Sequence, residues 1–197
     1  MAAVSEIIVR EYFELHEFLV RQHRKYIAQT KREEDDIDFF VLNPHPQKRV
    51  AELPFILSSP DLKFIARAVV VVKGWHTETF SMAVLAHAPE IFRFVEPKVF
   101  QQAARAFGAD GAPTKILVVP ALPQGEDARK QSIELLRSKG IDAVIPFHVM
   151  LADLIGHIEV NRNYQKSDLL QMIRILKNYD FFKEPQLELF KSRRKRH

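Results

Sequence analysis

The chain has 197 residues, of which 47% are hydrophobic and 27% are charged, so it can bury the core of one globular domain. It contains no cysteine, which excludes disulfide bonds and thiolate metal sites. The pI is about 9.3, but the final segment KSRRKRH holds five of the 29 basic residues and leaves 24 basic against 25 acidic residues elsewhere. The positive charge belongs to this tail, so a surface that coats nucleic acid over the whole domain is not indicated.

The sequence also lacks the features of a membrane or secreted protein. Its longest apolar runs are far below the length of a membrane-spanning helix. Charged residues come too early in MAAVSEIIVREYFE for a secretory signal. We therefore expect an intracellular, cytoplasmic protein.

The first third of the chain predicts a helix followed by strands. Residues 5–16 have apolar side chains near helical spacing, and residues 18–26 (FLVRQHRKY) indicate an extended segment. A charged turn at 31–36 leads into a predicted strand at 37–43 (IDFFVLN), which prolines end. Residues 44–67 are irregular, with room for one short strand in PFIL.

From residue 67 onward, strands and helices alternate. The run RAVVVVKGW (67–75) is rich in β-branched residues and predicts an interior strand that is buried on both faces. Ser167 is expected to cap the last helix. The predicted helices cover residues 96–108, 125–140, 148–158 and 168–182, and two strands lie between them at 115–122 and 142–147. This order predicts one α/β domain over residues 1–182, a three-layer α/β/α arrangement around a central mixed sheet, and a flexible tail at 183–197.

Acidic residues and a lysine occur in a specific order along these elements. Glu11 and Glu14 lie in the first helix, Asp38 lies in DDIDFFV, and Lys73 ends the valine strand. This order resembles the PD-(D/E)xK nuclease superfamily, especially its small resolvase-like members, and implies a restriction-endonuclease-like fold. The resemblance further implies that Asp38 and Glu11 or Glu14 bind Mg²⁺ and that Lys73 is catalytic.

Such a set of residues suits the cleavage of a phosphodiester bond. Carboxylates near strand ends can hold Mg²⁺ with most of its waters, and the metal polarises the phosphate and lowers the pKa of a bound water. The Lys73 ammonium would stabilise negative charge or orient the nucleophile. The chain departs from the family pattern at Val71, where an acid is expected two residues before the lysine. Glu78 is the nearest substitute acid, and Glu52 is a poorer one.

Two functions follow from this pattern, and the sequence leaves both open. The first is a Mg²⁺-dependent endodeoxyribonuclease acting on branched or damaged DNA, with Asp38, Lys73 and Glu78 as its catalytic residues. The second is a catalytically decayed, nuclease-like adaptor that binds DNA or a clamp, which Val71 motivates. An α/β domain that binds a nucleotide or another small molecule is a third alternative, although GADGAP (108–113) lacks the pattern of a phosphate-binding loop.

The C-terminal segment QLELF resembles the bacterial sliding-clamp-binding motif. The matching positions are Gln186, Leu187, Leu189 and Phe190. Such a peptide fills an apolar pocket with its last two side chains and makes polar contacts through its glutamine. Alternatively, LELF packs back on the domain as a terminal helical turn. The basic residues that follow can hold DNA phosphates without reading sequence, although a solvated end or a nuclear-localisation signal fits the same run; they are Arg193, Arg194, Lys195 and Arg196.

The histidines and the single tryptophan give weaker signals. The eight histidines show no spacing that is typical of a zinc site. His76 lies three residues after Lys73, where it would contact a scissile phosphate or cap the strand end. We expect Trp75 to pack against the core, with stacking on a nucleobase as the alternative.

Overall fold

The computed structural model describes residues 2–22, 37–48, 52–108 and 111–182. The chain divides into two compact units, Met1–Gly156 and His157–His197. The boundary between the two units falls within residues 1–182, for which the sequence predicts one domain. In the part of the chain that the structure describes, no helix is long and apolar enough to cross a membrane.

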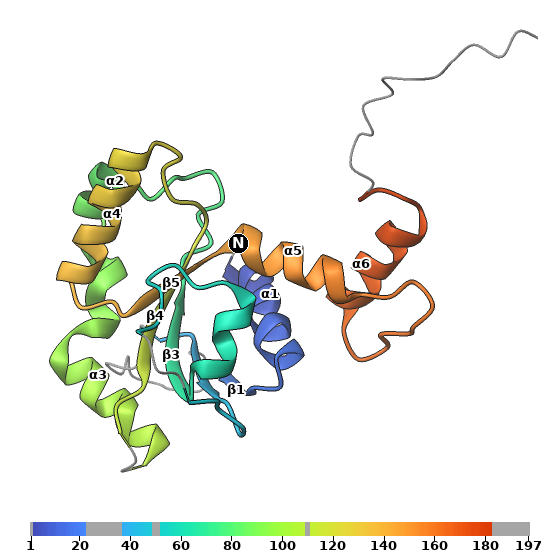
Figure 1. Ribbon diagram of the computed structural model, residues 1–197, viewed down its shortest axis with the longest axis horizontal. Helices are drawn as coiled ribbons and strands as arrows, with labels where there is room; N and C mark the ends of the chain where they lie inside the picture. The colour runs from blue at the N-terminus through green and yellow to red at the C-terminus, as the bar shows by residue number, and fades with distance from the viewer. Residues whose placement is uncertain (1, 23–36, 49–51, 109–110, 183–197) are drawn as a thin grey trace, which may run out of the picture. The chain divides into compact units, whose positions relative to one another are not determined.

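The larger unit is built on a five-stranded mixed sheet, as the sequence predicts (Figure 1). The strands are β1 (Leu19–Gln22), β2 (Phe39–Leu42), β3 (Arg67–Val72), β4 (Thr114–Val119) and β5 (Ala143–Pro146). Their order in space is their order in the chain. The pairs β1–β2 and β2–β3 are antiparallel, while the pairs β3–β4 and β4–β5 are parallel. An antiparallel meander thus passes directly into a parallel half.

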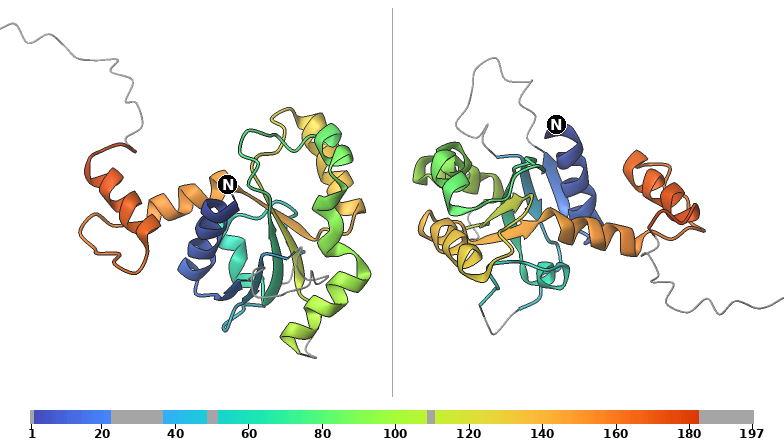
Figure 2. Two further views of the ribbon diagram at one scale, coloured as in Figure 1. Left: turned by 180° about the vertical axis from the view of Figure 1, so that it is seen from behind. Right: turned by 90° about the horizontal axis from the view of Figure 1, so that it is seen from above.

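Helices cover both faces of this sheet, which gives an α/β unit (Figures 1 and 2). On one side lie α1 (Ala2–Leu15) and α5 (Phe147–His157). The other side carries α2 (Met82–His87), α3 (Pro97–Ala104) and α4 (Glu126–Ser138). Three 3₁₀ helices complete the described part of the unit: η3 (Ser59–Phe64), η4 (Pro89–Val95) and η5 (Arg105–Phe107).

The valine strand lies in the centre of the sheet and is buried, as predicted. Val69 and Val71 pack in the core on the side of α2, α3 and α4, together with Leu117 of β4. Because successive side chains of a strand point to opposite faces, Val70 faces the side that α1 covers. Its exposed fraction is 0%. A strand that is apolar on both faces matches a position between two helical layers.

Several predicted elements differ in detail from the observed ones. The first helix begins at Ala2, earlier than residue 5. PFIL forms no strand of its own, and Ile56 makes an isolated bridge to Val144 of β5. The predicted helix at 96–108 ends in the 3₁₀ turn η5. No element was predicted between residues 77 and 95, where α2 and η4 form around side chains that enter the core, among them Leu85 and Ile91.

The described part of the smaller unit holds a loop and α6 (Asp168–Asn178). Ser167 caps α6 as predicted, since its side chain accepts the backbone N–H of Leu170 at 3.3 Å. Ile173 is the buried residue of the helix. The predicted cap therefore gives the start of this helix correctly, while the helix ends at Asn178, earlier than residue 182.

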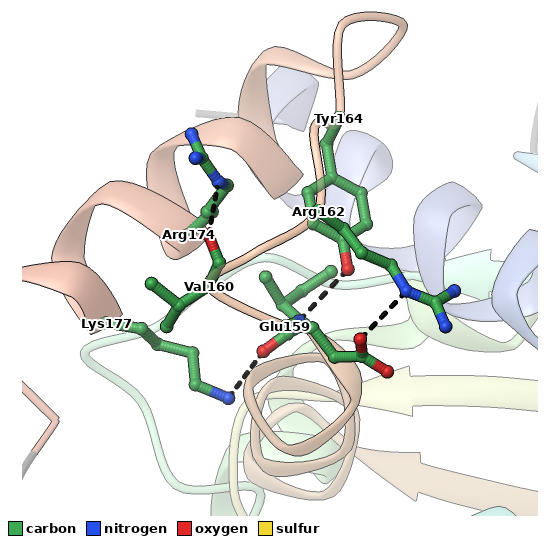
Figure 3. A network of polar contacts seen from close by, with 7 residues as sticks. Glu159, Val160, Arg162, Tyr164, Arg174 and Lys177 are labelled. Carbon is green, nitrogen blue, oxygen red and sulfur yellow. Dashed lines mark hydrogen bonds and ion pairs between the residues drawn. The ribbon is translucent and has the colours of Figure 1, made fainter.

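Basic side chains of α6 form hydrogen bonds with the segment that follows α5 (Figure 3). Lys177 Nζ donates to the carbonyl of Ile158 at 2.6 Å, and Arg174 Nε donates to the carbonyl of Val160 at 2.8 Å. Cations placed at the carbonyl groups beyond a helix end stabilise that end. These contacts hold α6 to the loop that precedes it.

Candidate functional site

Asp38 and Lys73 come to the same edge of the sheet. Strand β2 runs antiparallel to β3, so the start of β2 lies beside the end of β3. Strands β4 and β5 run parallel to β3 and end toward the same edge. The carboxyl ends of parallel strands are where α/β proteins commonly bind ligands. This edge is therefore the candidate site.

Asp38 is bound to the backbone of β3 through both its main chain and its side chain. Its N–H donates to the carbonyl of Val70 at 3.1 Å, and its Oδ2 accepts the N–H of Val72 at 2.7 Å. Only 9% of the residue is exposed. Hydrogen bonds to an ionised acceptor are short and strong, so Asp38 fixes the end of the valine strand.

Val71 lies between the two residues that Asp38 contacts and belongs to the apolar core. Its exposed fraction is 1%, and it packs with Phe40 and Leu117. The position where the resemblance leads one to expect an acid is thus filled by a core side chain.

Lys73 continues the main chain of β3 one residue beyond the strand. Its N–H donates to the carbonyl of Val118 at 3.1 Å, so the pairing with β4 extends to this residue. The residue is half-buried. The preceding residue, Val72, donates its N–H to the carboxylate of Asp38, so Asp38 and Lys73 lie at the same edge of the sheet.

The turn after Lys73 is locked against the first turns of α1. Ser5 has an exposed fraction of 0%, and its Oγ lies 2.9 Å from His76 Nε2. A Cβ atom added at Gly74 would lie 2.4 Å from Ser5 Oγ, so glycine is required here by the close approach of the helix. The His76 ring also meets the Phe147 ring edge-on, with the centroids 4.5 Å apart. His76 thus ties α1, the end of β3 and the start of α5 together.

Ser5 was missed by the sequence analysis, and no local pattern marks it. A serine near a histidine suggests a nucleophile and its base, but a nucleophile must reach its substrate. The complete burial of Ser5 argues for a structural hydrogen bond.

The acid of α1 that reaches this edge is Glu6. Its Oε2 accepts from Nε2 of Gln22, the last residue of β1, at 2.6 Å. The predicted acids Glu11 and Glu14 lie about 7.5 and 12 Å further along the helix axis at 1.5 Å per residue. Glu14 is exposed and accepts from Arg10 Nε at 2.8 Å, a hydrogen bond that raises the pKa of Arg10. The direction of α1 relative to the sheet selects Glu6, and the sequence alone does not give that direction.

The described side chains do not gather as a binding site for Mg²⁺. Across residues 2–22, 37–48, 52–108 and 111–182, no group of three or more His, Asp and Glu side chains could hold a metal ion. Asp38, Glu11, Glu14 and Glu78 therefore do not converge on one ion. A Mg²⁺ site built from one carboxylate and a core valine lacks the oxygen donors that this ion prefers.

Glu78 lies in the turn that follows β3. Its N–H donates to the carbonyl of Trp75 at 2.8 Å, and its exposed side chain lines a pocket together with Trp75 and His76. Glu52, the poorer candidate, is exposed. Trp75 is half-buried and packs on Phe80 with ring centroids 5.6 Å apart, which confirms the predicted packing against the core.

The predicted sites of the C-terminal tail lie outside the described residues. They are the clamp-like positions Gln186, Leu187, Leu189 and Phe190 and the basic positions Arg193, Arg194, Lys195 and Arg196. Both remain predictions from sequence.

Comparison with known proteins gives no match: no protein-family model, no curated protein and no solved structure is significantly similar to this chain.

Proposed function

We propose that the chain is a nuclease-fold protein of DNA metabolism that binds the DNA backbone at the edge where β2 begins and β3 ends. The observation that supports the proposal most is the hydrogen bond that Asp38 accepts from Val72, the residue before Lys73, at this edge. The elements occur in the order on which the PD-(D/E)xK resemblance rests, namely a helix, two strands and a third strand that Lys73 follows directly. A restriction-endonuclease-like fold is part of the proposal.

Binding without cleavage is the first candidate function. The Lys73 ammonium offers a point charge for a phosphate at the rim of the sheet. Asp38 holds the end of β3 through the Val72 amide, so its carboxylate positions the backbone that carries Lys73. Val71 is a core side chain, so this position lacks the carboxylate oxygen that would bind the metal ion in a metal-dependent hydrolase. This is the nuclease-like adaptor that binds DNA.

Metal-dependent hydrolysis of DNA is the second candidate, and the same contact between Asp38 and Val72, the residue before Lys73, favours it. In a hydrolase of this type, Asp38 would contribute one metal ligand and Lys73 would stabilise charge on the phosphate. Mg²⁺ would supply the activated water. Because the described residues fit such an ion poorly, we place this function second.

The two candidates are separated by one set of assays on the full chain. Gapped, flap and four-way-junction DNA are tested for binding in EDTA and for cleavage in Mg²⁺ or Mn²⁺. We expect binding that persists in EDTA and is weakened by Lys73→Met. The matched control is Lys63→Met, because Lys63 is exposed in η3, before β3 begins at the opposite edge. Metal-dependent cutting that Lys73→Met abolishes would establish the hydrolase instead, and a chain that neither binds nor cuts would refute both.

A bacterial sliding clamp is the protein partner in this proposal, supported by the sequence of the C-terminal peptide. The combined variant Gln186→Ala/Phe190→Ala removes two of the matching side chains, whereas Glu188→Ala changes the variable position between them. We expect the first to abolish binding to the clamp in a surface-capture assay and the second to leave it unchanged. Equal binding by both variants would contradict the partner. Removing the basic residues after Phe190 should weaken DNA binding and its salt dependence.

A further inference from the structure

A pocket with a volume of about 540 Å³ lies beside the candidate site. It is formed by the turn after β3 and by α2 with the start of η4, and its lining includes the residues Trp75, Glu78, Val84, His87, Ala88 and Glu90. The volume is in the range of pockets that hold small molecules or single chemical groups. Its apolar wall comes from Trp75, Val84 and Ala88.

The polar residues of the pocket are His76, Thr77, Glu78, His87 and Glu90, and the two carboxylates among them are hydrogen-bond acceptors. Glu78 and Glu90 contribute carboxylates. His87 Nδ1 lies 2.7 Å from the carbonyl oxygen of Ala83. Since a carbonyl can only accept, the Nδ1 of His87 donates this hydrogen bond. The pocket therefore favours a group that offers several N–H donors.

The charge of the pocket disfavours a phosphate. Among the described residues that line it there is no lysine or arginine, while two carboxylates are present. Trp75 offers an aromatic surface on which a planar group can stack. Together, an aromatic wall, apolar neighbours and acceptors describe the surroundings of a planar heterocycle with amino groups.

The pocket begins close to Lys73 in the chain, because Trp75 follows Lys73 by two residues. His76 also lines the pocket, and its Nε2 lies 2.9 Å from Ser5 Oγ. Two residues span at most about 7 Å, a separation that one nucleotide can bridge from its phosphate to its base. The phosphate would meet the ammonium, and the base would meet the acceptors.

We propose that this pocket takes one unpaired nucleobase with an exocyclic amino group from the DNA that the sheet edge holds, with the base stacked on Trp75 and its amino group donating to Glu78 or Glu90. The inference rests on the proposed function and adds its substrate class, DNA with an extrahelical or single-stranded base. Adenine and cytosine carry such an amino group and thymine does not. Stacking on an aromatic side chain is sequence-tolerant, so the acceptors supply the preference.

The test compares three duplexes that differ only at one bulged position: adenine, thymine or an abasic sugar. The backbone charge is the same in all three, so the differences in affinity report the base alone. We expect the full chain to bind the adenine bulge about fivefold or more tighter than the abasic bulge, with thymine between them. Equal affinity for the three duplexes would overturn the inference.

Variants then assign the preference to the pocket. Glu78→Met/Glu90→Met removes both carboxylates at exposed positions, and Glu134→Met is the control at an exposed position of α4. We expect the double variant to lose the preference for adenine over thymine and the control to keep it. A preference that survives in the double variant would place the base elsewhere and overturn the assignment. Lys73→Met should weaken all three complexes by the same factor.

The outcome also separates this inference from the proposed function. If the chain binds no DNA, the proposed function fails, and the pocket is tested with free deoxyadenosine and the fluorescence of Trp75, the only tryptophan of the chain. Saturable quenching that the double variant abolishes would support the pocket. No quenching up to the solubility limit of the nucleoside would overturn it.

Discussion

Gly74→Ala should destabilise the larger unit by overpacking the contact between the end of β3 and α1. The added Cβ would lie 2.4 Å from Ser5 Oγ and 3.1 Å from Ser5 Cβ, and neither atom can move freely because Ser5 is completely buried. Gly74 does not adopt a positive φ, so the cost comes from this contact and not from the backbone. Inserting a methyl group into a packed site costs about 1–3 kcal/mol, which is the expected loss in the free energy of unfolding.

A double-mutant cycle identifies the contact. Ser5→Ala removes the closest atom and should cost about 1 kcal/mol through the lost hydrogen bond to His76. If Ser5 is the obstacle, the double variant Ser5→Ala/Gly74→Ala should lose about 1 kcal/mol less free energy of unfolding than the two single variants lose together. The assay is urea unfolding, followed by circular dichroism and the fluorescence of Trp75.

Gly156→Ala is the matched control for the added methyl group. Apart from its chain neighbours and the backbone of its own helix, no described atom lies within 4 Å of a Cβ placed at Gly156 in α5, so this variant should be stabilised by up to about 1 kcal/mol. If Gly74→Ala leaves the free energy of unfolding unchanged, or if the losses of the two single variants simply add in the double variant, the predicted clash between residue 74 and Ser5 is refuted.

Three further perturbations test other parts of the structure. Burial raises the pKa of Tyr12. The folded state therefore gains stability from the protonated phenol, which is complete below pH about 10 and is lost as the pH rises above that value. In urea titrations, the free energy of unfolding should fall more steeply at alkaline pH for wild type than for Tyr12→Phe. Asp38→Ala leaves the Val72 N–H without its carboxylate and should lower the free energy of unfolding by about 1.5–3 kcal/mol, more than Asp38→Asn, which keeps an acceptor oxygen; equal losses would contradict this role. Lys177→Met removes the hydrogen bond to the Ile158 carbonyl and should speed amide hydrogen exchange in the smaller unit about fivefold. An unchanged exchange rate would show that this hydrogen bond adds no stability.

The sheet and most helices of the larger unit could be predicted because their signals are local. The valine run is β-branched throughout and matches a strand that is buried on both faces. Glycines and prolines mark the helix boundaries around α3 and α4. The segment with α2 and η4 was missed although Ser81 caps α2 and Pro89 begins η4, because the helices are short and depend on the burial of Leu85, Ile91 and Phe94 in the core.

The candidate site was predictable only in part, since it is made by contacts between distant segments. The sequence order of Asp38 and Lys73 suggests a common edge, and the antiparallel pairing of β2 and β3 provides it. Which acid of α1 reaches that edge depends on where the helix begins and how it crosses the sheet, so Glu6 could not be chosen over its neighbours in advance. The approach of Ser5 to Gly74 likewise needs the packed helix.

The central claim, that the sheet edge at Lys73 meets DNA phosphate, is tested most directly by the salt dependence of DNA affinity. Each neutralised phosphate contributes about 0.9 to the slope of log affinity against log salt concentration for duplex DNA. Lys73→Met should lower that slope by about this amount and weaken binding to every sequence alike, while Lys63→Met should leave both unchanged. Equal affinities and equal slopes of log affinity against log salt concentration for wild type and Lys73→Met would contradict the account.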